Sequence, residues 1–575
     1  MRLAAFDSCA QLRDDLRAAA ATSVGPYGLP GAGPVPEVVA GGARTGMDGV
    51  AGSAPTAFSR TNAHEPGADE PDIVKTDGRR IVTVSNGTLR VIDPATRMPG
   101  GRLDLGVAAA GVVNLLLSGD KALVLVSGDY GFSRVGTVAD PIADGPQLLL
   151  VDLAGAPRVV SRYRGEGILL DARQSGSVAR VVLRSTPRIT FPDLPNVSDD
   201  RARTDANRAA VRRAPADAWL PTWEVTRGGT TQRGSIGCDR VSRPAEYSGA
   251  AMLTILTFDL ATPALGSGDP VSIVADGDTV YGTGTSLYVA NDQRWRLTVW
   301  PARRDDGARQ RTDIYRFDTA GTRPPALAAA GSVPGWLVNQ YALSEWDGHL
   351  RVATTDDRAG TSAVRVLAPR GDRLVQVGVV DGLGKGERIY AVRFLGPRAY
   401  VVTFRQTDPL YSLDLADPGA PRVTGTLKIT GYSAHLQPAG DNQLLGIGQE
   451  ASAQGRVRGT QVSLFDVSDP AEPRRLDRVP LPGAQSEAEW DPHALLWWPA
   501  TRLLVVPVLA SQERIEALAL RVGDGGLARV GTVRQPGNAP VRRSLVVGDV
   551  LWTMSDAGVL GSSVSTMERL AWLPS

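Results

Sequence analysis

From Asp72 onward, short apolar runs alternate with turn residues along the chain. The runs are five to seven residues long and rich in β-branched side chains, as in DIVKTDGRRIVTVSNGTLRVIDP. In that stretch Asp77-Gly78 and Asn86-Gly87 stand where hairpin turns belong, because such pairs tolerate the positive φ angles of two-residue turns. The pattern predicts antiparallel strands joined by hairpins.

One element of this pattern recurs as a strand that ends in Asp, or its equivalent, followed by a turn containing proline. Its copies are RVIDPATRMP at 90, LLVDLAGAP at 149, LTFDLATP at 256, YRFDTAGTRP at 315, SLDLADPGAP at 412 and SLFDVSDPAEP at 463, with degenerate forms RVLAPRGD at 365 and RVGDGGLARV at 521. Well-separated copies lie about 46 to 59 residues apart, and an Arg/Asp/Pro-rich insertion at 190–247 doubles the interval between Asp152 and Asp259. A period near 50, with four strands per repeat, is the size of a propeller blade.

The sequence therefore predicts an all-β fold, a single large β-propeller of about eight four-stranded blades, with a range of seven to nine. The sixth blade is the most legible, with strands ERIYAVRF, AYVVTF, YSLDLA and RVTGTLKI. A ninth strand pair, RRSLVV and VLWTMS, fits eight blades if terminal strands mix at ring closure. Two packed β-sandwiches are the alternative, although no interdomain linker interrupts residues 72–575.

Two segments precede the propeller, which is expected to span 58–575. Residues 1–23 are expected to be helical, because Ser8 stands at a cap position and Leu12 and Leu16 follow at helical spacing. Residues 24–57 are almost all Gly, Ala, Pro, Val and Ser, the composition of a linker. Inside the insertion, ANRAAVRRAPADAWLP predicts a short basic helix that ends before Pro215, has Trp219 at its exit and packs as a cap.

Composition excludes several classes of protein. With 64 Gly and 40 Pro in 575 residues, long helices would be interrupted too often for a helical bundle. The 62 basic and 61 acidic side chains give a net charge of +1, so no overall field attracts nucleic acid or an anionic membrane. No apolar run reaches the length of a membrane span.

The chain has two cysteines, Cys9 and Cys238, and neither has a partner at zinc-binding spacing. They are either unrelated buried thiols or one disulfide, which would require an oxidising compartment. Asp7, Asp14 and Asp15 stand where a signal peptide would have its apolar core. The protein is accordingly expected to be cytoplasmic, or else its export signal is missing from this start.

Several segments carry a family resemblance: TNAHEPGADEPDIVKTDGRRIVTV, GERIYAVRFLGPRAYVVTFRQTDPLYSLDLADPGAP, GYSAHLQPAGDNQLLGIGQE, VSLFDVSDP, EAEWDPHALLWWP and CDRVSRP. Together they resemble a bacterial family of secreted proteins with a C-terminal β-propeller distantly related to WD-repeat proteins. The resemblance covers essentially the whole chain and implies a fold and a place outside the cytoplasm, extracellular or in the cell envelope, without an activity. It also favours the disulfide for Cys9 and Cys238, and a truncated start as the reason for the absent signal.

This chain departs from that family at two positions. Gln437 stands in YSAHLQP where the family resemblance would place a histidine, with His435 two positions earlier. Pro492 stands where the family usually has a histidine after Asp491. A metal role inferred from those family positions does not carry over to these residues.

Candidate chemistry gathers before the first strands of several blades. No linear motif of a nucleophile elbow, metalloprotease, EF-hand, dinucleotide fold or phosphate loop is present. The loops that enter the inner strands converge at the mouth of a propeller channel. Candidate ligand or channel-mouth residues there are Asp69, Glu70, Asp72, Lys75, Asp77, Glu387, Tyr390, His435, Glu489, Asp491 and His493. One interpretation is a polar ring that binds a divalent cation such as calcium; the other is that the acids accept hydrogen bonds from tight turns.

Lys75 and the tryptophans have their own interpretations. Lys75 is expected to pair with a carboxylate as part of a polar latch that locks the first blade against the last. Trp497 and Trp498 lie in one strand and should face opposite sides of the sheet, with at least one in the core. Trp295 and Trp300 are candidates for an exposed stacking site.

The function predicted is an extracytoplasmic binding or interaction scaffold. Rigid blades would present loops to a protein or glycan, with no nucleic acid and no cofactor identified, and the chain would be a monomer. The competing prediction is a hydrolase in which Glu387, Glu489 and Asp491 act as general acid and base.

Overall fold

The structure is a computed structural model of the whole chain. It describes residues 3–29, 57–107, 112–128, 145–194, 199–244, 249–292, 310–405, 408–452, 456–511 and 514–575. Most of the expected linker 24–57, together with Trp295 and Trp300, lies outside the described residues. The chain divides into two compact units, unit 1 comprising Met1–Val38, Ala110–Pro334 and Pro369–Leu374, and unit 2 comprising Val39–Ala109, Gly335–Ala368 and Val375–Ser575.

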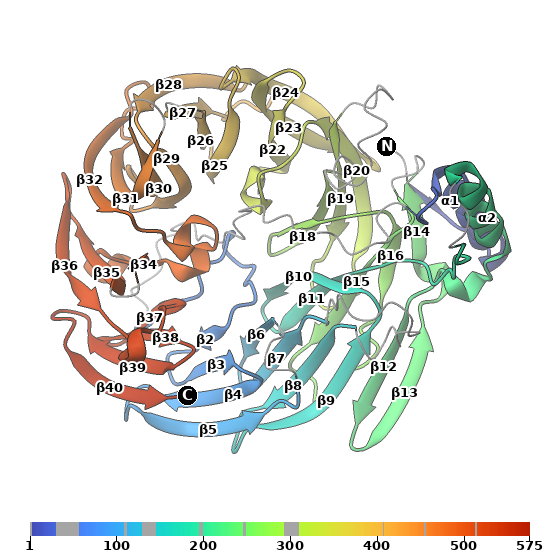
Figure 1. Cartoon of the computed structure of the whole chain (residues 1–575), viewed down its shortest axis with the longest axis horizontal. Helices are drawn as coiled ribbons and strands as arrows, with labels where there is room; N and C mark the ends of the chain where they lie inside the picture. The colour runs from blue at the N-terminus through green and yellow to red at the C-terminus, as the bar shows by residue number, and fades with distance from the viewer. Residues whose placement is uncertain are drawn as a thin grey trace. The chain divides into compact units, whose positions relative to one another are not determined.

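The repeated element in both units is a meander of four antiparallel strands, which is the propeller blade expected from the sequence (Figure 1). The described residues form nine such blades, three in unit 1 and six in unit 2. This is the upper end of the expected range, and the sandwich alternative is wrong. The strand pair RRSLVV and VLWTMS is β37 and β38, the first half of a complete blade.

Unit 2 holds the blades that position the candidate site. Their strands are β2 Val74–Thr76, β3 Ile81–Ser85, β4 Thr88–Asp93 and β5 Met98–Asp104; β21 Leu343–Trp346, β22 His349–Asp356, β23 Thr361–Arg370 and β24 Arg373–Leu383; β25 Arg388–Leu395, β26 Arg398–Phe404, β27 Asp408–Asp414 and β28 Arg422–Ile429; β29 Tyr432–Pro438, β30 Gln443–Ala451, β31 Val457–Asp466 and β32 Arg474–Pro482; β33 Leu496–Trp498, β34 Leu503–Ser511, β35 Arg514–Val522 and β36 Leu527–Val533; β37 Arg543–Val547, β38 Val550–Ser555, β39 Gly558–Ser563 and β40 Arg569–Pro574. Short 3-10 helices in this unit are η4 Gln340–Ala342, η5 Glu487–Glu489, η6 Pro492–Ala494, η7 Pro499–Thr501 and η8 Pro536–Asn538.

Unit 1 contains three blades, two of which carry extra strands from the insertion. The strands are β6 Val113–Ser118, β7 Lys121–Val126, β8 Gln147–Asp152 and β9 Arg158–Gly165, extended by β12 Thr222–Arg227 and β13 Thr230–Ser235; β10 Ile168–Ser175, β11 Val178–Ser185, β15 Met252–Asp259 and β16 Val271–Val274, extended by β14 Val241–Pro244 and β1 Leu3–Ala5; and β17 Thr279–Gly282, β18 Ser286–Asn291, β19 Arg311–Asp318 and β20 Ala326–Pro334. The insertion also supplies η1 Ala216–Ala218 and η2 Cys238–Arg240. The insertion therefore widens existing sheets at their edges.

The recurring Asp at the end of the third strand of a blade has a local structural reason. Its side chain accepts a hydrogen bond from the backbone N–H two residues on, at 2.9 to 3.3 Å, which closes an Asx-turn. The residues that do so are Asp93, Asp152, Asp259, Asp318, Asp414 and Asp466. In three blades an Arg at the start of the next strand also pairs with this Asp. The repeat is thus a turn signal for the edge of each blade.

The core lies between adjacent blades, where apolar side chains of facing sheets interdigitate. Trp552 of β38 is fully buried and packs with Val74, Ile81 and Ile92 of the first blade. Burial of each such side chain contributes about 1.5 to 3 kcal/mol. Trp498 is buried in the core while its neighbour Trp497 packs, partly exposed, against a different cluster, as the strand alternation predicts.

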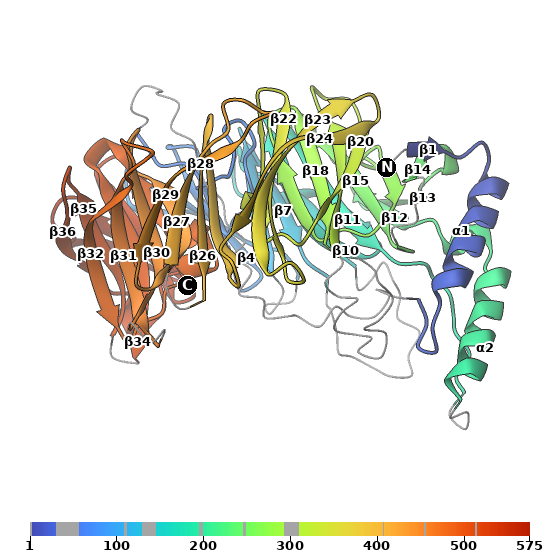
Figure 2. The same ribbon diagram turned by 90° about the horizontal axis from the view of Figure 1, so that it is seen from above.

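The two helices pack together in unit 1 (Figure 2). Helix α1, Cys9–Ser23, begins after Ser8, whose hydroxyl accepts a hydrogen bond from the Gln11 backbone N–H at 3.1 Å. Helix α2, Asp200–Arg213, ends before Pro215, and Trp219 is buried in the cluster that α1 and α2 share. The expected N-terminal helix and the expected cap helix in the insertion are both confirmed.

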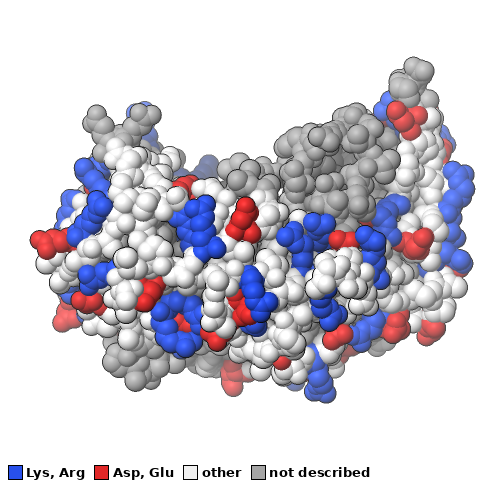
Figure 3. Space-filling view, turned by 90° about the horizontal axis from the view of Figure 1, so that it is seen from below, with Lys and Arg blue, Asp and Glu red and all other residues white. Residues whose placement is uncertain are grey.

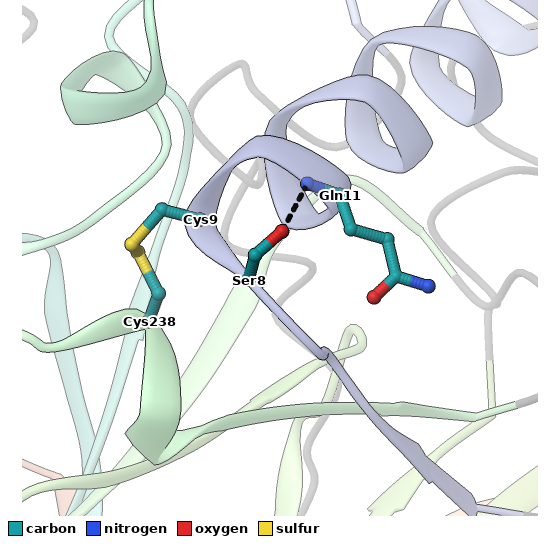
Figure 4. Close-up of a disulfide and its surroundings, with 4 residues drawn as sticks. All are labelled: Ser8, Cys9, Gln11 and Cys238. Carbon is teal, nitrogen blue, oxygen red and sulfur yellow. Dashed lines mark hydrogen bonds between the residues drawn. A yellow bond between two sulfur atoms is a disulfide. The ribbon is translucent and has the colours of Figure 1, made fainter.

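A disulfide links α1 to the insertion (Figure 4). The Cα atoms of Cys9 and Cys238 are 5.3 Å apart, and the two residues are 229 positions apart in the sequence. The disulfide predicted from the family resemblance is confirmed, and the alternative of two unrelated thiols is wrong.

Candidate functional site

A buried polar cluster of unit 2 surrounds Arg543, the first residue of β37. Its guanidinium Nε donates to Asp72 Oδ1 at 2.7 Å, Nη2 to Asp491 Oδ2 at 2.5 Å and Nη1 to Glu487 Oε1 at 3.1 Å. Asp72 precedes β2 of the first blade, whereas Glu487 and Asp491 lie in the loop of η5 and η6. We call Arg543 with Glu70, Asp72, Glu487, Asp491 and His493 the carboxylate cluster.

This cluster joins the first and last blades, which lie side by side in unit 2 (Figure 1). The same junction includes a backbone bridge between Phe58 and Val547 and a hydrogen bond from the Ser59 backbone N–H to Val546. The sequence predicts a polar latch at this place with Lys75 as its cation. The structure has such a latch, but the cation that spans the two blades is Arg543.

The electrostatics of the cluster follow from burial opposed by ion pairing. Burial raises the pKa of Glu487, and Arg543 and Arg542 only partly offset this effect. Burial also opposes ionisation of Asp491, but Arg543 and His493 outweigh it and hold the pKa of that carboxyl well below its usual range. Because Arg543 is only 5% exposed, these pairs are screened little by water.

His493 lies between two carboxylates. Its Nδ1 is 3.2 Å from Asp491 Oδ1, and its Nε2 is 3.3 Å from Glu70 Oε2, close enough for an ion pair although not aligned as a hydrogen bond. Burial lowers the pKa of this imidazole, but the two carboxylates outweigh it and raise the pKa of His493 to about 10. His493 is therefore a cation at neutral pH and a second counter-charge within the cluster.

Glu70 connects the cluster to η4, the segment before β21. It is 2% exposed, and its carboxylate accepts hydrogen bonds from the His64 backbone N–H and from Gln340 Nε2, both at 3.4 Å. His64 in turn stacks edge-on against Tyr341 with ring centroids 4.4 Å apart. These contacts make the loop before β2 part of the packed interior.

Lys75 forms a separate, local pair. Its ammonium donates to Asp69 Oδ1 at 2.8 Å, to Thr61 Oγ1 at 2.6 Å and to the Glu70 backbone carbonyl. All three partners lie within 14 residues of Lys75 in the chain. The predicted pairing of Lys75 with a carboxylate is thus present, and it folds the polar loop back on itself.

Glu489 belongs to a capping box at η5. Ser486 accepts from the Ala488 backbone N–H, and the Glu489 carboxylate accepts from the Ser486 backbone N–H at 3.1 Å and from Thr460 Oγ1 at 2.5 Å. Gln449 Nε2 also donates to it. Burial raises the pKa of Glu489 despite these donors.

Four other predicted site residues lie apart from the carboxylate cluster. Asp77 accepts from the Arg79 and Arg80 backbone N–H groups in a turn, the second interpretation that the sequence left open. Glu387 accepts from Thr403 Oγ1 at 2.5 Å. Tyr390 packs with Phe404 and Tyr432 in an aromatic trio with centroids 4.6 to 5.6 Å apart.

His435 is the fourth of these residues. It is 4% exposed, and burial together with the charge of Arg393 lowers the pKa of His435 to about 3. It is therefore neutral at physiological pH, unlike His493. The two histidines that the sequence groups together occupy opposite electrostatic environments.

The arrangement does not resemble a metal site in the part of the chain that the structure describes. No group of three or more His, Cys, Asp or Glu side chains among these residues could hold a metal ion. Arg543 occupies the position between Asp72 and Asp491 that a cation would need.

Gln437 and Pro492, the two residues at which the chain differs from the resembled family, contact the same side chain. Asn62 Nδ2 donates to Gln437 Oε1 at 3.4 Å and to the Pro492 carbonyl at 3.3 Å, so both residues help to hold the loop that contains Asn62.

Sequence reasoning missed Arg543, Glu487 and the buried His64 as members of this network. Arg542-Arg543 opens an otherwise apolar strand, RRSLVV, and this was the available signal. Arg543 pairs with Asp72, which lies 471 positions earlier in the chain. The sequence alone does not indicate such a pair, because it depends on how the blades are placed.

Comparisons with known proteins bear on the fold of the chain. A family model described as a beta propeller domain matches residues 58–567. An uncharacterised protein of Methanocaldococcus jannaschii is 38% identical over 228 residues, which is 39% of this chain and 35% of that protein. An uncharacterised protein of Archaeoglobus fulgidus is 44% identical over 189 residues, 32% of this chain and 28% of that protein. The matches therefore span about a third or less of these curated relatives' lengths.

Among solved structures, that of a eukaryotic initiation factor is similar at 10% identity with a TM-score of 0.39, covering 84% of this chain and 89% of that one. The organisms of the two relatives are archaeal. A bacterial, secreted origin therefore stays a prediction.

The face of the molecule in Figure 3 shows no large patch of a single charge among the described residues. On the face in Figure 3, basic and acidic side chains are interspersed over the described residues, in keeping with the net charge of +1. Within the described part of the chain, no helix has the length and apolar character needed to cross a membrane.

Proposed function

Because the chain belongs to the beta propeller domain family, we propose that it is a binding scaffold that holds a protein or glycan partner on its blade loops without chemical change. A shared fold does not imply a shared activity, so the function depends on the chemistry of the site residues.

The observation that carries this proposal is that the three carboxylates offered for hydrolysis are already committed to other groups. Glu387 is bound by Thr403, Glu489 by Thr460, Gln449 and its own helix cap, and Asp491 by Arg543 and His493. A general base must reach a substrate proton within hydrogen-bond distance. Asp491, with its pKa held low by an ion pair, is a weak base, while Glu489 accepts three hydrogen bonds and Glu387 accepts one from Thr403.

We also propose that the protein works outside the cytoplasm. Both of its cysteines are joined in one disulfide that links α1 to the insertion, and such bonds persist in oxidising compartments. Alkylation of freshly extracted protein without reductant, followed by peptide mapping, tests this. Recovery of Cys9 and Cys238 as free alkylated thiols would overturn it.

The scaffold proposal is tested by identifying the partner and then asking whether it is altered. Chemical cross-linking in the extracellular and envelope fractions, followed by purification of the captured component, supplies a defined ligand for a binding isotherm. We expect saturable binding with an unchanged mass of the ligand, and Glu489→Gln should bind within about twofold of wild type, because Gln preserves the acceptor for Thr460.

The hydrolase alternative makes the opposite prediction. It retains one supporting observation, the raised pKa of Glu489, which is the property of a general acid. Release of a hydrolysis product by wild type that Glu489→Gln or Glu387→Gln abolishes would overturn the scaffold proposal. Size-exclusion chromatography with light scattering tests the expected monomer in the same preparations.

A further inference from the structure

A small pocket in unit 1 is formed by three hairpin turns of two neighbouring blades. It has a volume of about 270 Å³ and lies against the β10–β11, β17–β18 and β19–β20 turns. Seven residues from these turns are Ser175, Gly176, Ser177, Thr283, Gly284, Thr319 and Gly321. Hydroxyl groups and glycine amides in one small volume are donors suited to an anionic oxygen.

The charged residues that line this pocket are all basic. They are Arg173 and Arg180, from β10 and β11, and no Asp or Glu is among the lining residues in the described structure. Each of the two arginines is 4% exposed. A buried charge is expensive unless it is paired, so the partner of each guanidinium decides what the pocket does.

Arg173 has a carboxylate of its own. Its Nη1 lies 2.8 Å from Asp171 Oδ2, and Nη2 donates to the Val280 backbone carbonyl at 2.8 Å. The same is true of Arg184, which follows Arg180 on the same face of β11 and is paired with the buried Asp276. Two buried arginines close to Arg180 in β10 and β11 therefore each have a carboxylate that balances their charge.

Arg180 is the exception. Its Nη2 donates to the backbone carbonyls of Thr319, Gly321 and Arg323 at 3.2, 2.8 and 2.9 Å. Its Nε and Nη1 are buried and have no acceptor, and no carboxylate lies within ion-pair distance of it, among the residues that the structure describes. Burial lowers the pKa of Arg180 to about 10, which is the expected response of a desolvated charge without a counter-ion.

We propose that this pocket, which we call the Arg180 pocket, binds a small oxyanion, a phosphate or carboxylate group, as the counter-charge of Arg180. The anion would pair with the Arg180 guanidinium and accept from the hydroxyls of Ser175 and Thr283, whereas the Ser177 hydroxyl already donates to Asp259 at 2.7 Å. A pocket of about 270 Å³ has room for such an anion and is too small for a folded segment of another protein. The site is in unit 1, so it stands independently of the binding function proposed above.

A purely structural role for Arg180 predicts something different. In that case the three carbonyl contacts with residues 319–323 would be its whole purpose, and the empty volume beside it would have no preference for anions. An anion site and a purely structural role can be distinguished by two results: whether anions bind, and whether their binding depends on the Arg180 side chain.

Titration of the oxidised full-length protein with inorganic phosphate and, separately, acetate tests the proposal, with sodium chloride at matched ionic strength as the reference. Isothermal calorimetry and the melting temperature are the two measurements. We expect saturable binding and a rising melting temperature with at least one anion, and the anion with the lower dissociation constant identifies the group.

Two variants and one control locate the effect. Arg180→Met should weaken binding at least about tenfold, whereas Arg351→Met, at a buried arginine of unit 2 that donates to Ser344 and Gly396, should leave it within about twofold. Thr322→Glu, at an exposed position on the pocket rim, supplies a tethered carboxylate. It should raise the melting temperature in chloride and abolish the response to added anion.

The proposal is overturned if wild type shows no saturable response to either anion, or if folded Arg180→Met binds as wild type does. Should Arg180→Met fail to fold, Thr322→Glu decides alone, because an unchanged anion response in that variant would place any anion elsewhere.

Discussion

Replacing Arg543 by methionine is the sharpest test of the carboxylate cluster as a structural latch. The change preserves apolar volume and removes the cation that Asp72, Glu487 and Asp491 share. Removing one partner of a buried ion pair costs about 3 to 5 kcal/mol, because the other charge stays buried without a counter-ion.

The cost should be close to that of one broken pair, although three carboxylates are involved. Glu487 retains Arg542 at 2.9 Å, and Asp491 retains His493 at 3.2 Å. Among the described residues, the hydrogen bond that remains to Asp72 comes from the Ile73 backbone N–H at 2.8 Å. We therefore expect Arg543→Met to lower the free energy of unfolding of unit 2 by about 4 kcal/mol at pH 7.

The assay is urea unfolding followed by tryptophan fluorescence, with hydrogen exchange of the β37 amides as a local readout. Arg422→Met is the matched control, since Arg422 pairs with Asp414 but is 65% exposed, and it should cost no more than about 1 kcal/mol.

The pH dependence of the free energy of unfolding is a second, independent test of the latch. In wild type the lowered pKa of Asp491 contributes stability above its unfolded value of 3.8, which is lost as pH falls through the folded value. In Arg543→Met the stranded carboxylates gain stability on protonation, so the difference from wild type should shrink as pH falls from 7 toward 4. A loss below about 1 kcal/mol at pH 7, or a difference that grows in acid, would refute the latch.

Three further predictions concern other parts of the chain. Because the folded pKa of His493 is about 10 and its unfolded value 6.5, its contribution to stability is complete below pH 6.5 and is lost as pH rises toward 10; His493→Gln should flatten that decline in a denaturation series. Reduction of Cys9–Cys238, or the double serine variant, should destabilise unit 1 by up to about 5 kcal/mol, since the closed loop is long, and an unchanged melting temperature in reductant would contradict this. Gly448→Ala would bring a Cβ within 2.0 Å of a backbone carbonyl and should cost about 3 kcal/mol in urea unfolding, whereas Gly155→Ala, with open space around it, should change stability by less than about 1 kcal/mol.

The blades could be predicted because their signals are local. The strand ending in Asp predicts a blade edge, and the Asx-turns at Asp93, Asp414 and Asp466 show that the same four or five residues contain the whole cause. Helix α1 was equally legible, since a cap and an apolar spacing within sixteen residues suffice. The central prediction of eight blades is one fewer than the nine that the described residues form, because the last blade lacks a clear Asp-Pro turn.

Only some of the residues of the candidate site could be predicted. Asp72, Asp491 and His493 stand out as polar residues before inner strands, but their partners come from distant segments. Whether a histidine there becomes charged, as His493 does, or neutral, as His435 does, depends on which side chains surround it after packing.

The amino-acid sequence is sufficient to predict repeated four-stranded blades with a helix before them, because turns, strand alternation and helix caps depend on a few neighbouring residues. The packing of distant segments places Arg543 rather than Lys75 between the first blade and the last, and it leaves Arg180 without the carboxylate partner that Arg184 has, among the residues that the structure describes. The physical reason is that ion pairing in a buried site is set by distances of about 3 Å between residues hundreds of positions apart, and burial makes those distances decisive.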